Sequence, residues 1–121
     1  MMDSFARKAA RMHAGGTPRV LDLFAGCGGL SLGFHAVGFD IRAAIEFDPD
    51  AAKSRGINFH GGAAEHCVAR DIIQTHPERI AAELGLGRLE NAVDVIVGGP
   101  PCQAFARVGR PKLREIDAHP H

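Results

Sequence analysis

The 121-residue sequence has no surplus of charge of either sign. Lys and Arg together number 14, Asp and Glu also number 14, and the formal net charge is zero. A chain that binds nucleic acid by itself more often carries a basic surplus. If DNA is a substrate, most of the surface that contacts its phosphates is therefore expected to lie elsewhere.

Cysteine is also scarce, and its spacing argues against two common uses. Cys27, Cys67 and Cys102 are an odd set that contains no Cys-x-x-Cys pair. This disfavours a disulfide framework or a zinc ribbon and fits a reducing cytosol. His66 precedes Cys67 directly, but the ligand spacings of structural zinc sites are absent, so we expect no metal.

No segment predicts export or membrane insertion. The first residues include Asp3 and are not followed by an apolar stretch of the signal-peptide type. No apolar run approaches the roughly 20 residues that cross a bilayer. We expect a cytoplasmic protein whose length corresponds to one domain or to part of one.

The sequence does contain short apolar runs that alternate with helical segments. Strands are expected at 19–24, 39–45, 66–70 (the weakest) and 93–97, and helices at 4–14, 30–37, 48–56 and 77–84. Ser4 and Asp48 are the expected N-caps, and Gly56 is expected to end the third helix. This alternation predicts an α/β fold with a parallel sheet, right-handed crossovers and helices on both faces.

Glycines fill the turn between the first strand and the next helix, in Ala25-Gly-Cys-Gly-Gly29. Such a turn presents backbone N–H groups at the positive end of a helix dipole, and it lets a ligand approach the backbone closely. The last glycine of Gly-x-Gly-x-x-Gly is missing, so a tight turn without a ligand stays an alternative. Cys27 is expected to pack inside this turn.

Acidic residues follow the second and third expected strands. Glu46 lies 20 residues after Gly26, which is about the spacing of a ribose-binding carboxylate; the alternative is an exposed surface glutamate. Phe47 could stack on a base or simply pack. Asp71 could accept a hydrogen bond from an adenine amino group or cap a helical turn.

Cys102 follows the fourth expected strand in Gly98-Gly-Pro-Pro-Cys-Gln103. Ligands of open parallel sheets bind beyond the carboxyl ends of the strands, and the two prolines stiffen this loop. Arg107 and Arg110 follow closely, and nearby cations favour the thiolate form. The alternative is a buried structural cysteine, which is the usual role of a lone cysteine.

Four of these segments resemble the motifs of the DNA cytosine-5 methyltransferases. Asp22-Leu-Phe-Ala-Gly-Cys-Gly-Gly-Leu-Ser-Leu-Gly-Phe34 resembles the first motif, and Gly98-Gly-Pro-Pro-Cys-Gln-Ala-Phe105 resembles the catalytic fourth motif. Glu46 matches the acidic residue of the second motif, and Asp71-Ile72 matches the third. The resemblance runs from about residue 19 to residue 110, in the family's order.

The resemblance implies a partial Rossmann-like methyltransferase fold of about four parallel strands, with S-adenosylmethionine as methyl donor. It implies that Cys102 attacks C6 of a flipped-out cytosine, that Pro101 positions the loop and that Gln103 lies near the flipped base. Glu46 would bind the ribose hydroxyls, Phe47 would pack on adenine, and Asp71 would meet its amino group. The full implied cofactor set is Asp22, Phe24, Ala25, Gly26, Gly28, Gly29, Leu30, Glu46, Phe47, Asp71 and Pro100.

The resemblance also shows which parts of the family pattern this sequence lacks. No Glu-Asn-Val motif, whose Glu helps to activate the cytosine, follows Cys102. We therefore expect an N-terminal helix and linker at 1–18, a partial catalytic domain at 19–110 and a truncated loop at 111–121. The strand at 93–97 would be an exposed apolar edge.

We expect this chain to be inactive alone and to act on double-stranded DNA only within a complete enzyme. A complementary chain with the remaining motifs is a possible partner. Three other interpretations stay open: a non-catalytic module that binds S-adenosylmethionine or a partner, part of a tRNA cytosine-5 methyltransferase, and part of a nicotinamide oxidoreductase. Of these, the Pro-Pro-Cys-Gln segment argues against the last.

Overall fold

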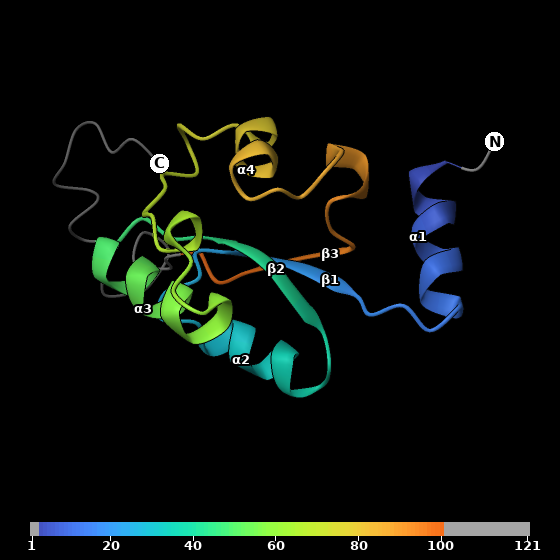
Figure 1. The fold of residues 1–121 in the computed structure, drawn as a ribbon, viewed down its shortest axis with the longest axis horizontal. Coiled ribbons are helices and arrows are strands. Elements are labelled where there is room, and N and C mark those ends of the chain that lie inside the picture. Colours follow the sequence, from blue (N-terminus) through green and yellow to red (C-terminus); the bar gives the residue numbers. More distant parts are fainter. Residues whose placement is uncertain (1–2, 101–121) are drawn as a thin grey trace, which may run out of the picture.

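The computed structural model describes residues 3–100, which form a small parallel sheet with helices on both faces (Figure 1). The predicted catalytic residues Pro101, Cys102 and Gln103 lie outside the described residues. The elements are α1 (Ser4–His13), β1 (Arg19–Leu23), α2 (Gly29–Ala36), β2 (Asp40–Ile45), α3 (Pro49–His60), the 3₁₀ turn η1 (Ala64–His66), α4 (Pro77–Glu83), the 3₁₀ turn η2 (Leu89–Asn91) and β3 (Val95–Gly98).

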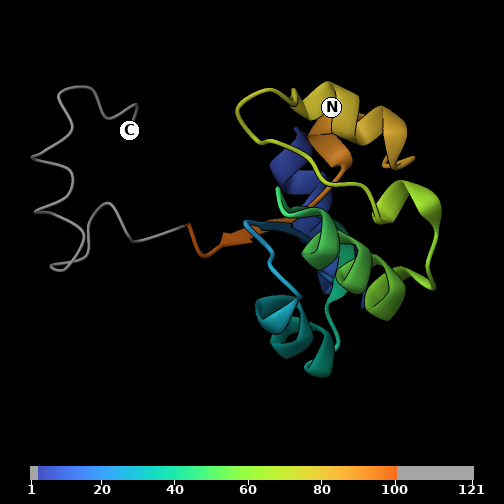
Figure 2. The same ribbon diagram turned by 90° about the vertical axis from the view of Figure 1, so that its left-hand side faces the viewer.

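The sheet has the order β2-β1-β3, and both neighbours run parallel to β1. Figures 1 and 2 show α2 and α3 on one face and α4 with η2 on the other. Leu23 at the end of β1 pairs with Ile45 of β2 and with Gly98 of β3. The carboxyl ends of all three strands therefore meet at one edge, and the predicted α/β architecture is confirmed.

The expected strand at 66–70 is wrong, so the described part of the chain has three strands instead of about four. The ring of His66 stacks on His60 with centroids 3.6 Å apart. The Arg70 guanidinium donates to Glu83 and to the carbonyl oxygens of Glu65 and Val68. These side-chain contacts hold the segment in an irregular path instead of an extended ladder.

Two helix boundaries also differ from expectation. Gly56 lies inside α3, which continues to His60 and ends at Gly61, whose φ is 62°. Gly56 is needed there because a Cβ at this position would lie 2.5 Å from Cys67 Sγ and 2.7 Å from the His66 carbonyl oxygen. At the other end of the chain, Asp3 caps α1 in place of Ser4, because its carboxylate accepts from the Ala6 N–H at 2.7 Å.

Helix α1 is tied to the sheet by Asp94, which immediately precedes β3. The Asp94 side chain is 1% exposed and forms an ion pair with Arg11 of α1. The same carboxylate accepts a hydrogen bond from the Arg19 N–H at the start of β1, at 2.8 Å. Burial by itself would raise the pKa of Asp94, but the hydrogen bonds from Arg11 and Arg19 outweigh burial and lower it.

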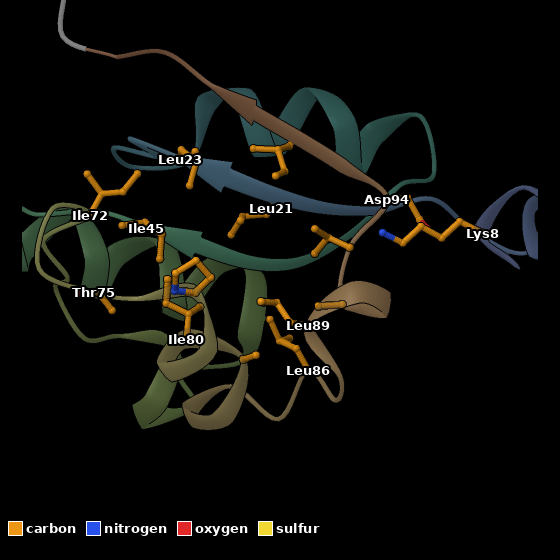
Figure 3. Close-up of a pocket in the computed structure, with 15 residues that line it drawn as sticks. Lys8, Leu21, Leu23, Ile45, Ile72, Thr75, Ile80, Leu86, Leu89 and Asp94 are labelled. Atoms are coloured by element: carbon orange, nitrogen blue, oxygen red, sulfur yellow. The ribbon is translucent and has the colours of Figure 1, made fainter. Parts of the chain in front are cut away.

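An apolar cavity of about 490 Å³ separates the sheet from α4 and η2. In Figure 3 the side chains of Leu21, Leu23 and Ile45 point from the sheet toward Ile80 and Leu86. Beside it, β3 forms the outer edge of the sheet, and its Ile96 is 62% exposed. This face of the described fold is therefore only partly filled. No helix within residues 3–100 has the length and apolar character needed to cross a membrane.

Candidate functional site

The turn after β1 has an unusual backbone. Phe24, Gly26 and Gly28 all have positive φ, at 54°, 57° and 105°. Positive φ is rare for a bulky residue such as Phe and is strained, and strain of this kind clusters at functional sites. The Phe24 side chain is 39% exposed. The sequence predicted a tight turn here, but the strained Phe24 is visible only in the structure.

Glu46 joins this turn to the end of β2. Its Oε2 accepts a hydrogen bond from the Gly26 N–H at 2.9 Å, and its Oε1 accepts from the Phe47 N–H at 3.0 Å. The turn is also held by the Ala25 N–H, which donates to the Ile45 carbonyl oxygen at 3.0 Å. The glycine turn and Glu46 thus lie at adjacent strand ends, as expected, and the direct hydrogen bond between them is a feature that the sequence did not predict. Glu46 is not a free surface carboxylate.

Asp71 reaches the same edge by a different route from the one expected. The expected strand at 66–70 is not formed. Instead the Arg70 N–H donates to the Glu46 carbonyl oxygen at 2.7 Å, which brings Asp71 next to the end of β2. The Asp71 carboxylate accepts from the Ile73 N–H at 2.9 Å. Asp71 therefore caps a turn, which was one of its two predicted roles.

The other predicted residues have mixed exposure. Phe47 is 72% exposed and Leu30 is 44% exposed, so both present apolar surface at the edge. Asp22 is fully buried beneath the turn instead of lying on its surface. Cys27 is exposed, so the expectation that it packs inside the turn is wrong.

The end of β3 completes this edge. Gly98 lies against β1, where an added Cβ would be 3.1 Å from the Leu23 carbonyl oxygen. Gly99 and Pro100 follow it and are exposed. The segment that leads to Cys102 therefore leaves the sheet beside the turn at Phe24.

Sequence reasoning missed three residues that lie behind the glycine turn. Ser31 and Arg55 are buried, at 0% and 2% exposure, and both belong to a hydrogen-bonded group with Asp22. Phe59 lies against Gly28, where an added Cβ would be 2.5 Å from the ring. The available signal was Asp22 itself, because a carboxylate inside a buried strand requires a polar partner.

The comparisons with known proteins agree with the geometry of this edge. A family model described as C-5 cytosine-specific DNA methylase matches residues 18–117. The chain belongs to this methylase family. A proposed type II methyltransferase of Oceanobacillus iheyensis is 38% identical over 104 residues, which cover 82% of this chain and 21% of that protein.

Solved methylase structures give the same result. The crystal structure of a proposed DNA modification methyltransferase from an Escherichia coli prophage has a TM-score of 0.60 and 37% identity, and the match covers 80% of this chain and 26% of that one. The Dnmt2 methyltransferase of S. pombe has a TM-score of 0.52 and 27% identity, with 86% and 28% covered. The fold of this methylase-family chain is therefore a partial Rossmann-like methyltransferase fold, of the type that uses S-adenosylmethionine. The chain spans 21% to 28% of the length of these relatives.

Proposed function

We propose that this chain is the cofactor-binding and nucleophile-bearing part of a DNA cytosine-5 methyltransferase. It would bind S-adenosylmethionine at the carboxyl edge of the sheet, beside the loop that carries Cys102. The complete enzyme would use double-stranded DNA as its substrate and would act on C5 of a flipped-out cytosine.

One observation carries this proposal, namely the hydrogen bond between the Gly26 N–H and Glu46 Oε2 at 2.9 Å. It places a carboxylate and a glycine turn side by side at the ends of two adjacent parallel strands, which is where open α/β sheets bind nucleosides. A carboxylate offers about four acceptor positions. The N–H groups of Gly26, Phe47 and Asp48 use three of them, so Glu46 can hold the turn and still accept from a ribose hydroxyl.

The shape of the turn supports the same assignment. A Cβ built on Gly26 or on Gly29 meets no atom within 4 Å, so both positions face open space. Helix α2 begins at Gly29, and the N-terminal N–H groups and dipole of a helix favour an anionic group, such as the carboxylate of the cofactor's methionine portion. The exposed ring of Phe47 would cover the adenine, and Asp71 would meet its amino group. The hydrogen bond from the Arg70 N–H to the Glu46 carbonyl oxygen supports this role of Asp71.

Cys102 would act as the nucleophile. It follows Pro100 by two residues, and two residues of chain span at most about 7 Å. Its thiolate would bond to C6 of the flipped cytosine as the C5=C6 double bond opens, which makes C5 nucleophilic enough to accept a methyl group. Loss of the C5 proton to a base would then re-form the double bond and release the Cys102 thiolate. When bound, S-adenosylmethionine supplies that methyl group. Pro101 would position the loop, and Gln103 would lie near the flipped base.

Segments beyond this chain would complete the enzyme. The chain spans only 21% of one curated relative and 26% of one solved structure. The open edge of β3 and the partly filled cavity beneath α4 leave room for further segments to pack there. Those segments would belong either to a longer chain or to a complementary one. Methyl transfer is accordingly assigned to the assembled enzyme and not to the isolated chain.

Isothermal titration of the 121-residue chain with S-adenosylmethionine tests the cofactor assignment, with NAD as the competing ligand class. We expect binding of S-adenosylmethionine alone. Glu46→Gln should weaken the affinity by about 10- to 150-fold, because a hydrogen bond to a charged acceptor contributes roughly 1.5–3 kcal/mol. Asp50→Asn is the matched control, because Asp50 is an exposed acidic residue in the first turn of the neighbouring helix α3.

Two outcomes would count against the assignment. If the chain bound NAD and not S-adenosylmethionine, the methyl-donor site would be wrong. If Asp50→Asn weakened binding as much as Glu46→Gln, the role of Glu46 would be wrong. The nucleophile is tested separately in the assembled enzyme, where Cys102→Ser should abolish incorporation of labelled methyl groups into DNA while Cys67→Ser should not.

A further inference from the structure

A buried polar cluster lies directly beneath the glycine turn. Asp22 and Ser31 are 0% exposed and Arg55 is 2% exposed. The Ser31 hydroxyl donates to Asp22 Oδ2 at 2.5 Å, and the Arg55 Nη2 donates to Ser31 Oγ at 3.3 Å. The hydroxyl of Ser31 thus links a carboxylate on the central strand to a guanidinium on α3.

The two charges in this cluster depend on each other. A buried ion is costly unless an opposite charge and hydrogen bonds compensate for it. Burial lowers the pKa of Arg55, and the negative charge of Asp22 opposes that effect. Arg55 stays protonated at any ordinary pH because an arginine is not deprotonated in proteins. The guanidinium charge is therefore present at any ordinary pH. Removal of either Asp22 or Arg55 leaves the other side chain buried without its partner.

The cluster surrounds the turn from three elements. Asp22 lies on β1 just before Phe24, Ser31 lies in the first turn of α2, and Arg55 comes from α3. The Arg55 guanidinium also lies 5.4 Å from the centroid of the Phe59 ring. That ring contacts Gly28, where an added Cβ would be only 2.5 Å away. Helix α3 therefore supports the turn at two points, through Ser31 and through Gly28.

Helix α3 also begins next to Glu46. Its N-cap is Asp48, two residues further along the chain, and the Asp48 N–H donates to Glu46 Oε1 at 3.4 Å. The same helix thus touches the carboxylate at one end of the proposed cofactor site and the glycine turn at the other. A shift of α3 would move both halves of the site relative to each other.

We propose that Arg55 is a positioning residue for cofactor binding, because it holds the glycine turn through Ser31 in the shape that receives S-adenosylmethionine. This inference rests on the proposed function. Without Arg55 the turn would sample several backbone shapes, and apparent affinity falls with the fraction of molecules in the competent shape. Arg55 need not touch the cofactor for this effect.

The test measures S-adenosylmethionine affinity by titration for the unaltered chain and for three variants. Arg55→Met removes the charge, and Arg55→Lys keeps it. The double variant Asp22→Asn with Arg55→Met removes both charges, so it avoids an unpaired buried carboxylate if the single variant fails to fold. We expect a loss of about tenfold for Arg55→Met and for the double variant, typical of coupled neighbouring groups, and at most about threefold for Arg55→Lys.

Two controls separate positioning from general destabilisation. Ile80→Val removes a methylene from the core near α4 and lowers stability without touching the turn. Arg88→Met removes an arginine whose side chain is 81% exposed. Both should leave the affinity unchanged when measured under conditions in which circular dichroism shows every variant to be folded.

Hydrogen exchange gives a second measure that needs no cofactor. Arg55→Met and the double variant should speed exchange of the amides from Gly26 to Ser31, whereas Ile80→Val should not. If Arg55→Met and the double variant both left affinity and exchange unchanged, the positioning role of Arg55 alone would be overturned. Failure of the unaltered chain to bind S-adenosylmethionine would overturn the proposed function and the role of Arg55 in it.

Discussion

Gly56 offers a sharp test of how α3 packs against η1. In an exposed helix interior, Ala is more stable than Gly by about 1 kcal/mol. At Gly56 the added methyl would lie 2.5 Å from Cys67 Sγ, 2.7 Å from the His66 carbonyl oxygen and 2.9 Å from the His66 carbonyl carbon. The Cys67 side chain can rotate away, but the His66 carbonyl belongs to the backbone, so η1 must move as a unit.

The expected magnitude follows from two opposing terms. Overpacking a filled site costs about 1–3 kcal/mol, and the displaced η1 also carries the His66 ring that stacks on His60. Because this backbone segment must move, we place the cost in the upper part of that range, at about 2–3 kcal/mol. Subtracting the helix-propensity gain of about 1 kcal/mol leaves Gly56→Ala destabilised by about 1–2 kcal/mol. Gly33 is the matched control, because it is exposed inside α2 and an added Cβ there meets nothing within 4 Å. Gly33→Ala should stabilise the chain by about 0.5–1 kcal/mol.

Urea unfolding followed by far-ultraviolet circular dichroism measures both substitutions. This signal suits a chain that has neither Trp nor Tyr. The two unfolding midpoints should move in opposite directions with the same slope. If Gly56→Ala were as stable as the unaltered chain or more stable, the close packing of η1 on α3 would be refuted.

Three further predictions concern the same chain. Asp94→Asn should lower the free energy of unfolding by about 1–3 kcal/mol, because it breaks the buried pair with Arg11; urea titration measures the loss. Burial first, and then the stacked ring of His66, lower the pKa of His60 to about 4. Since this folded-state value lies below the ordinary value of 6.5, the unfolded chain takes up the proton first. The contribution of His60 to the free energy of unfolding should be constant above about pH 6.5 and should fall toward pH 4. We expect a loss of about 1–2 kcal/mol, which allows for the partial exposure of the ring. In urea unfolding at several pH values, His60→Gln should flatten that fall. Cys27 is exposed, so Cys27→Ser should remove one fast-reacting thiol from a titration of the native chain with a disulfide reagent; an unchanged count would contradict that exposure.

The edge of the sheet could be predicted from local pattern because parallel strands impose its geometry. Short apolar runs marked β1, β2 and β3, and the carboxyl ends of such strands must meet at one edge. That rule predicted that Glu46 and the glycine turn lie at adjacent strand ends, and the structure adds a direct hydrogen bond between Glu46 and the Gly26 N–H. The glycine turn between β1 and α2 was predictable for the same reason.

The features that sequence reasoning missed depend on tertiary contacts. Gly56 looks like a helix end, yet it is the point where α3 makes room for η1. Residues 66–70 look weakly like a strand, yet the buried side chain of Arg70 binds Glu83 and nearby carbonyl oxygens instead. Arg55 resembles a surface residue of α3, yet it is buried where it binds Ser31 and lies over the Phe59 ring. At all three positions, tertiary contacts override what the local sequence pattern predicts.

The sheet order has a consequence for synthesis on the ribosome. The first strand to emerge, β1, becomes the central strand, and β2 and β3 add to it on opposite sides as they appear. Each strand therefore docks onto a partner that is already available, and within residues 3–100 no later strand inserts between two earlier ones. In a longer chain, a strand that followed β3 would extend the sheet outward at Val95–Gly98 without disturbing the edge that holds Gly26 and Glu46. In such a chain the open side of β3 would be the growing end of the sheet during translation, and its exposed Ile96 would need prompt coverage by the next segment or by a chaperone.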